Sequence, residues 1–95
     1  MNTYQRKCKR RLESYLRSQF VPLHKVTEGT LNGVNSYCFI LEPESSRMNL
    51  SEISSNAKKQ FKKAAVKLGK GSHPIYAPEM HFPTIFLTFR SEQHV

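Results

Sequence analysis

Apolar residues recur at spacings of three and four over residues 4–20, which is the pattern of one buried helical face. Asn2 or Thr3 can cap the start of this helix, and Pro22 ends it because proline cannot donate the next backbone hydrogen bond. The pattern therefore predicts a helix over residues 4–20. Its buried face consists of Tyr4, Cys8, Leu12, Tyr15, Leu16 and Phe20.

A β-hairpin is expected next, because Asn32-Gly33 is the residue pair best suited to a type I′ turn, in which both central positions need positive φ. The first arm is expected over Leu23–Leu31 and the second arm over Val34–Leu41. The second arm is apolar on both faces, which is typical of a strand in the centre of a sheet.

This turn also sets the register of the two arms. Pairing outward from the turn places Val26 opposite Phe39 and Thr30 opposite Asn35. Gly29 weakens the first arm and marks a candidate bulge, since glycine inside a strand has no side chain to pack.

A second apolar stripe with helical spacing follows the polar residues 42–46. Asn49 and Glu52 have the spacing of a capping box at its start, and Gly69 supplies a C-terminal stop. These signals predict a helix over residues 50–68. Its apolar face consists of Leu50, Ile53, Ala57, Phe61, Ala64, Ala65 and Leu68.

The last part of the chain is rich in proline. Pro74, Pro78 and Pro83 predict a loop over residues 70–83, because proline disrupts both regular helices and central strands. The apolar residues 84–90 that follow it predict a last strand.

Together these elements predict a single small α+β domain over residues 1–95, since a chain of this length has room for one hydrophobic core. The expected order is α-β-β-α-β, with a three-stranded sheet and two helices packed on it. Residues 1–3 and 91–95 are expected to fray. A last strand running parallel to Val34–Leu41 would make the second helix a right-handed crossover.

The net charge of +8 is unevenly distributed along the chain. Residues 1–20 sum to +5 and residues 58–70 to +6, whereas residues 21–57 sum to −2 and residues 71–95 to −1. Both predicted helices are therefore cationic and the predicted sheet is not, which is the footprint expected for a partner with repeated negative charge. The candidate contact residues are Arg6, Lys7, Lys9, Arg10, Arg11, Arg17, Lys58, Lys59, Lys62 and Lys63.

The two predicted helices differ in what their charge indicates. Lysines near the end of the second helix interact favourably with the negative end of the helix dipole, so they need no partner. Arg6 and Lys7 fall in the first turns of the first helix, where the dipole favours acids instead. Arg10 and Arg11 add to the repulsion, and guanidinium groups can make bidentate contacts to phosphate or carboxylate. The first helix therefore indicates docking of an anionic partner.

Other motifs are weak. Residues 56–69 (NAKKQFKKAAVKLG) resemble the lysine-rich closing helix of double-stranded RNA-binding domains. Those domains have the order α-β-β-β-α, from which the expected order departs, so their binding residues are not carried over. His24, His73, His81 and His94 lack the spacing that would place two ligands on one face, and neither a metal site nor a cofactor is predicted.

Three apolar side chains in the proline-rich loop form a candidate protein-contact surface. They are Tyr76, Met80 and Phe82, which are expected to be exposed. Long loops with apolar tips are often recognition elements, and prolines lower the entropy lost on binding. The alternative interpretation is that the three side chains cover one edge of a small core.

The preferred hypothesis is a non-enzymatic regulatory protein that docks an anionic partner, with DNA or RNA favoured over an acidic protein. One alternative is an inhibitor or derepressor, of the kind that phages and mobile elements encode, which binds a host protein or repressor. A second alternative is a small toxin-type ribonuclease assembled from His73, His81, Tyr76 and Arg90.

A cytoplasmic location is expected. The chain has no run of about 18 apolar residues, and no apolar segment follows the basic N-terminal residues as it would in a signal peptide. Cys8 and Cys38 are expected to be reduced and partly buried.

Overall fold

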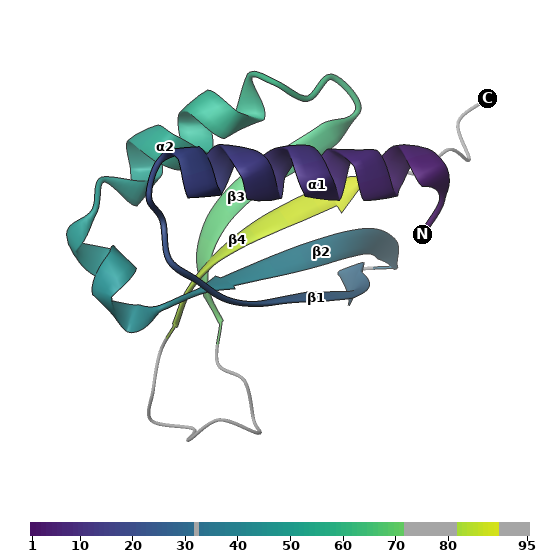
Figure 1. Cartoon of the computed structure of the whole chain (residues 1–95). Helices are drawn as coiled ribbons and strands as arrows, with labels where there is room; N and C mark the ends of the chain where they lie inside the picture. The colour runs from purple at the N-terminus through teal and green to yellow at the C-terminus, as the bar shows by residue number, and fades with distance from the viewer. Residues whose placement is uncertain (32, 72–81, 90–95) are drawn as a thin grey trace.

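The computed structural model describes residues 1–31, 33–71 and 82–89, which form a four-stranded antiparallel sheet with helices on one side (Figure 1). The strands lie in the order β1-β2-β4-β3. In chain order the elements are α1 (Thr3–Ser18), β1 (Leu23–Leu31), β2 (Val34–Leu41), the 3-10 helix η1 (Pro43–Arg47), α2 (Leu50–Lys58), β3 (Ala64–Gly71) and β4 (Phe82–Phe89). None of the helices in these residues is long and apolar enough to cross a membrane.

The α+β class expected from the sequence is confirmed, but the sheet has four strands and not three. The added strand comes from the predicted helix over residues 50–68, which was wrong in its second half. α2 ends at Lys58, and β3 begins at Ala64 after the connecting residues 59–63. The resemblance to the closing helix of double-stranded RNA-binding domains fails for the same reason.

Side-chain alternation explains why this segment is a strand. Ala64 and Val66 are buried in the core, whereas Lys67, the residue after Val66, lies on the other side of the sheet and is exposed. A helix continued through these residues would place Lys58 beside Lys62 at a destabilising like-charged i,i+4 spacing. The strand instead pairs with β4 along its whole length.

The hairpin is confirmed in position and register. Gly33 has φ +79°, as the turn requires. Val26 pairs with Phe39 and Thr30 pairs with Asn35, as predicted. β2 lies between β1 and β4, so the prediction of a central strand is also confirmed.

The irregularity in β1 is not at the predicted position. Gly29 pairs in register with Ser36, and the register shifts between Leu23 and Lys25. The bulge prediction at Gly29 was therefore wrong, and the shift lies where β1 enters the sheet.

β4 runs antiparallel to β2, so the last strand does not pair parallel to β2. β2 and β3 are both antiparallel to β4 and run parallel to each other, so α2 lies in the crossover between β2 and β3. Pro83 lies within β4, although its residue type argued against a central strand. It is tolerated because the β2–β4 pairing ends at Thr84, which leaves Pro83 paired only with β3. Part of the predicted loop over residues 70–83 is thus strand, and residues 72–81 lie outside the described residues.

The core lies between the helices and one face of the sheet. Leu12 and Leu16 of α1 are fully buried there. They share one cluster with β-strand residues that alternate toward the helices, including Phe39, Ile85 and Leu87. Truncating a fully buried leucine to alanine costs about 2–5 kcal/mol, so this stripe fixes α1 on the sheet.

The start of α1 is capped by Asn2, one of the two residues that the sequence offered. The Asn2 side chain accepts a hydrogen bond from the Gln5 backbone N–H at 2.9 Å, and the Gln5 side chain accepts one from the Asn2 N–H at 3.1 Å. This capping box uses neutral glutamine, so the first turn of α1 contains no acid.

The two ends of the predicted apolar stripe are exposed. Tyr4 is 45% exposed and Phe20 is 88% exposed. Phe20 lies beyond the end of α1 in the left-handed conformation, with φ +59°. Two backbone hydrogen bonds close the helix around it, from Val21 to Leu16 and from Phe20 to Arg17, both at 3.0 Å.

Candidate functional site

The cations of α1 lie on two flanks of its buried stripe. On the flank facing β2, the Lys9 ammonium lies 6.0 Å from the centre of the Tyr37 ring. Arg6 and Arg10 also act on Tyr37 electrostatically. On the other flank, Lys7 and Arg11 face the connection between α2 and β3. The ten candidate cations therefore do not form one surface.

Lys7 and Arg11 line a hollow of about 380 Å³ between α1 and residues 60–63, which we call the cationic hollow. Lys62 and Lys63 line its other side. Four of the predicted contact residues, from segments far apart in the sequence, thus meet at one place. Among the described residues the complete lining is Tyr4, Lys7, Cys8, Arg11, Gln60, Phe61, Lys62 and Lys63, and it contains no acid.

Local structure fixes the second side of this hollow. After α2, the Gln60 N–H bonds to the Ala57 carbonyl at 3.0 Å and the Phe61 N–H bonds to the Lys58 carbonyl at 3.2 Å. The Phe61 side chain is buried, which anchors the turn to the core. Lys62 follows this anchored turn directly, so its backbone position is defined although its side chain is exposed.

The charges of the cationic hollow have no acidic partner among the described residues. Two ion pairs are present in that part of the chain, Arg17–Glu13 at 2.8 Å and His24–Glu42 at 3.1 Å. Glu13 is the one acid in α1, and it forms its ion pair with Arg17. Each like-charged pair at helical neighbour spacing costs a few tenths of a kcal/mol, on the order of 0.2–0.5, and this cost is uncompensated at the hollow.

Tyr4 of α1 and Tyr37 of β2 remain neutral because the pKa of each is raised. A hydrogen bond with the Cys8 side chain, together with partial burial, raises the pKa of Tyr4. Burial raises the pKa of Tyr37, and the Glu28 carboxylate adds to this effect. Neither hydroxyl therefore adds negative charge near the basic side chains.

A second hollow lies at the opposite end of α2 and differs in chemistry. It has a volume of about 590 Å³, and we call it the apolar hollow. No charged residue is found in the described part of its lining, and Leu68 is 39% exposed there. The lining residues are Ser46, Met48, Asn49, Leu50, Ser51, Leu68, Gly69 and Pro83.

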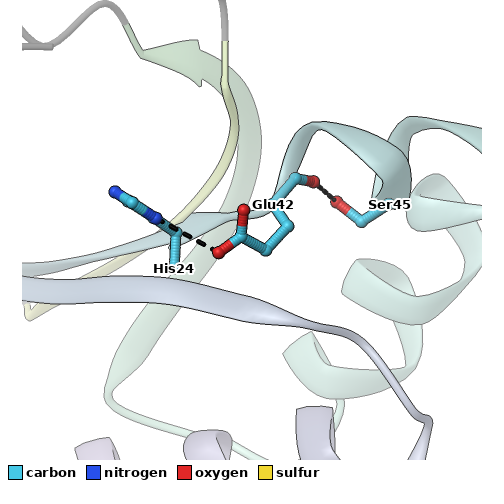
Figure 2. Close-up of polar contacts among 3 residues, drawn as sticks. All are labelled: His24, Glu42 and Ser45. Atoms are coloured by element: carbon cyan, nitrogen blue, oxygen red, sulfur yellow. Dashed lines mark hydrogen bonds and ion pairs between the residues drawn. The ribbon is translucent and has the colours of Figure 1, made fainter.

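Glu42 organises the corner where β2 ends and η1 begins. Figure 2 shows its carboxylate beside His24, with Oε1 3.1 Å from Nδ1, while its backbone carbonyl accepts a hydrogen bond from the Ser45 hydroxyl at 2.6 Å. The His24 ring also stacks on Phe82, with centroids 5.2 Å apart. Phe82 is consequently buried, and the prediction that it is exposed was wrong.

The remaining candidates are placed as follows. Lys58 is the last residue of α2 and Lys59 follows it, while Arg17 lies in the last turn of α1 and pairs with Glu13. Tyr76 and Met80 lie outside the described residues, as do all four residues of the ribonuclease alternative. The described ranges contain no group of three histidines, cysteines or acids that could hold a metal ion. Cys8 and Cys38 are both free, the first buried and the second half-buried.

Four residues of the cationic hollow were missed as site residues. Tyr4, Cys8 and Phe61 were assigned to apolar stripes, and Gln60 carries no distinctive signal in the sequence. The one available signal was the position of Tyr4 at the margin of its stripe, one turn before Cys8 and beside Lys7.

A scan of protein-family models and searches of curated proteins and of solved structures return no match for this chain. Its function is therefore inferred from the geometry and charge described above.

Proposed function

We propose that this protein is a non-enzymatic binding protein whose partner is nucleic acid, held through phosphate contacts at the cationic hollow. The observation that supports the proposal is the convergence of Lys7, Arg11, Lys62 and Lys63 around one hollow with no acid among its described lining residues. Isolated lysines on a solvated helix need no partner, but four cations facing one hollow repel one another. Phosphate groups would remove that cost.

Nucleic acid suits this arrangement better than a single small anion. Lys9 and Arg10 extend the positive charge along the other flank of α1, so a partner with repeated charge can contact both flanks. Arg11 can make a bidentate contact to a phosphate, while the lysines act as point charges.

The test is fluorescence anisotropy with labelled 20-nucleotide DNA and RNA at salt concentrations from 50 to 300 mM. Four phosphate contacts predict that log K falls against log salt with a slope of about −3 to −4. Replacing two contacts, Lys7→Gln with Arg11→Gln, should make the slope shallower by about 2.

The matched control removes the same charge elsewhere, by Arg47→Gln with Lys67→Gln, neither of which lines the cationic hollow. This control should keep the slope within about half a unit of the parent value. Absence of binding at 50 mM salt would refute the proposal. Cleavage of the RNA during the assay would favour the ribonuclease alternative instead.

A second candidate function is docking of a protein partner, as in the inhibitor or derepressor alternative. The apolar hollow supports it, because Leu68 is exposed beside Met48 and Pro83 with no charged neighbour among the described lining residues. A stoichiometric complex recovered from nuclease-treated lysate, and lost with Leu68→Asp, would support this candidate. Recovery of the same amount of complex with the Leu68→Asp variant would count against this candidate.

A further inference from the structure

Tyr4 is an exposed aromatic ring set among the cations of the hollow. It is 45% exposed and lines the same hollow as Lys7 and Arg11. It is also held in place, because it packs edge-on against Phe89 with ring centroids 6.4 Å apart. Phe89 in turn packs edge-on against the buried Tyr37, at 5.9 Å. The ring is therefore fixed from the core side and open from the solvent side.

The opposite wall of the hollow offers a neutral hydrogen-bonding group. Gln60 is exposed, lines the hollow, and its side chain makes no hydrogen bond to another described residue. A glutamine amide carries two donors and one carbonyl acceptor, which match the edge of a nucleobase. Phe61 beside it is buried and adds an apolar floor.

From this geometry we propose that the cationic hollow receives an unpaired nucleotide, so that the partner is single-stranded nucleic acid. The base stacks on Tyr4, Gln60 bonds its edge, and Lys7, Arg11, Lys62 and Lys63 hold the adjoining phosphates. This inference rests on the proposed function and specifies its substrate class. A volume of about 380 Å³ lies within the range of sites that enclose small ligands, roughly 300–1,000 Å³.

The hollow that the ring lines lies between two segments of the chain and does not admit a paired base. In a duplex each base is stacked on both faces and its edge is used in pairing, so it cannot enter a hollow between α1 and residues 60–63. A duplex can reach only the outer cations. Base–aromatic stacking is available to every base, so little sequence preference is expected from Tyr4.

The chain contains no tryptophan, which provides a direct test. Tyr4→Trp introduces a single reporter in the hollow. Its emission should be quenched by single-stranded 20-nucleotide DNA or RNA. Duplex DNA of the same length and inorganic polyphosphate should leave its emission unchanged even when they bind at 50 mM salt.

Affinity measurements provide a second test of the inference. Tyr4→Leu should weaken binding of single strands by about 5- to 150-fold, the range for loss of one stacked base, and should change duplex binding less than twofold. Tyr4→Phe keeps the ring and should retain the parent affinity. Circular dichroism and thermal melting of each variant verify that α1 is folded. Gln60→Ala, which leaves the core untouched, should weaken single-strand binding as well.

Two results would overturn the inference while leaving the proposed function intact. One is equal or tighter binding of duplex with no response to Tyr4→Leu. The other is a similar loss on single strands and duplex, which would assign Tyr4 a purely structural role. Failure of the parent protein to bind any nucleic acid at 50 mM salt would instead refute the proposed function itself.

Discussion

The two hollows differ in charge, although one lies at the start of α2 and the other beside the residues that follow its end. The cationic hollow is lined by four basic residues, whereas the described lining of the apolar hollow contains none. Among the described residues, Glu42 and Glu44 lie at η1 and Glu52 lies at the start of α2, close in sequence to residues that line the apolar hollow. Four basic residues from two segments therefore meet at the cationic hollow, and none lines the described part of the apolar hollow.

The starts of the two helices show the same contrast. α2 is capped by Asn49 and has Glu52 in its first turn, as the helix dipole favours. α1 begins with a capping box built on Gln5 and has no acid in its first turn. The acid in the first turn of α2 stabilises that helix, so stability alone explains its position. The basic residues at the start of α1 work against the helix dipole, which indicates that their charge has another role.

The largest expected effect comes from reversing charge on both sides of the cationic hollow. Lys7→Glu with Lys63→Glu should weaken nucleic-acid binding by more than about 50-fold at 0.1 M salt, since two phosphate contacts are lost. Thermal stability should be equal or higher, because an acid one turn before Arg11 relieves repulsion within α1. Anisotropy and thermal melting measure the two quantities. A fall in both affinity and thermal stability would mean that these lysines support the fold. The difference in charge between the two hollows would then have no functional meaning.

The next effect concerns stability at the apolar hollow. A Cβ at Gly69 would lie 2.8 Å from Cε2 of Phe86, so Gly69→Ala should reduce the free energy of unfolding by about 1–3 kcal/mol. Gly29→Ala is the matched control, because nothing lies within 4 Å of its Cβ. Urea denaturation compares the two. Nucleic-acid affinity of the folded Gly69→Ala protein should be unchanged, and a loss would show that the two hollows are coupled.

The smallest effect is a gain in stability at the end of α1. Phe20 has a positive φ, which disfavours residues with a Cβ by about 1–2 kcal/mol, and its side chain is largely exposed. Phe20→Gly should therefore raise the free energy of unfolding by about 1 kcal/mol. Gln19→Gly, at a residue with φ −92°, should give no gain. A lower melting temperature for Phe20→Gly would mean that the exposed ring contributes packing.

Local signals were sufficient to predict part of the fold. The sequence signal Asn32-Gly33 predicted the hairpin and its register, because a two-residue connection fixes which residues face each other, and the observed pairing agrees. Asn2 determined the start of α1 through its own side chain. In both cases the deciding interactions lie within a few residues along the chain.

Residues 59–71 could not be predicted in this way. Ala64, Val66 and Leu68 alternate as a strand requires, yet Ala64 and Leu68 also fit a helical stripe with Ala57 and Phe61. Pairing with β4 decides between the two, and that contact is distant in sequence. The cationic hollow depends on the same outcome, because Lys62 and Lys63 reach α1 only when α2 ends before them.

Two double variants with the same net charge test the central claim most directly. Lys62→Ser with Lys63→Ser removes two charges from the cationic hollow, and Ser46→Glu with Ser51→Glu adds two acids at the apolar hollow, so each lowers the net charge from +8 to +6. If placement governs binding, the first should reduce affinity for a single-stranded 20-nucleotide DNA by about 30-fold at 0.1 M salt and the second by less than threefold. Equal losses in the two variants would contradict the claim, because binding would then follow net charge alone.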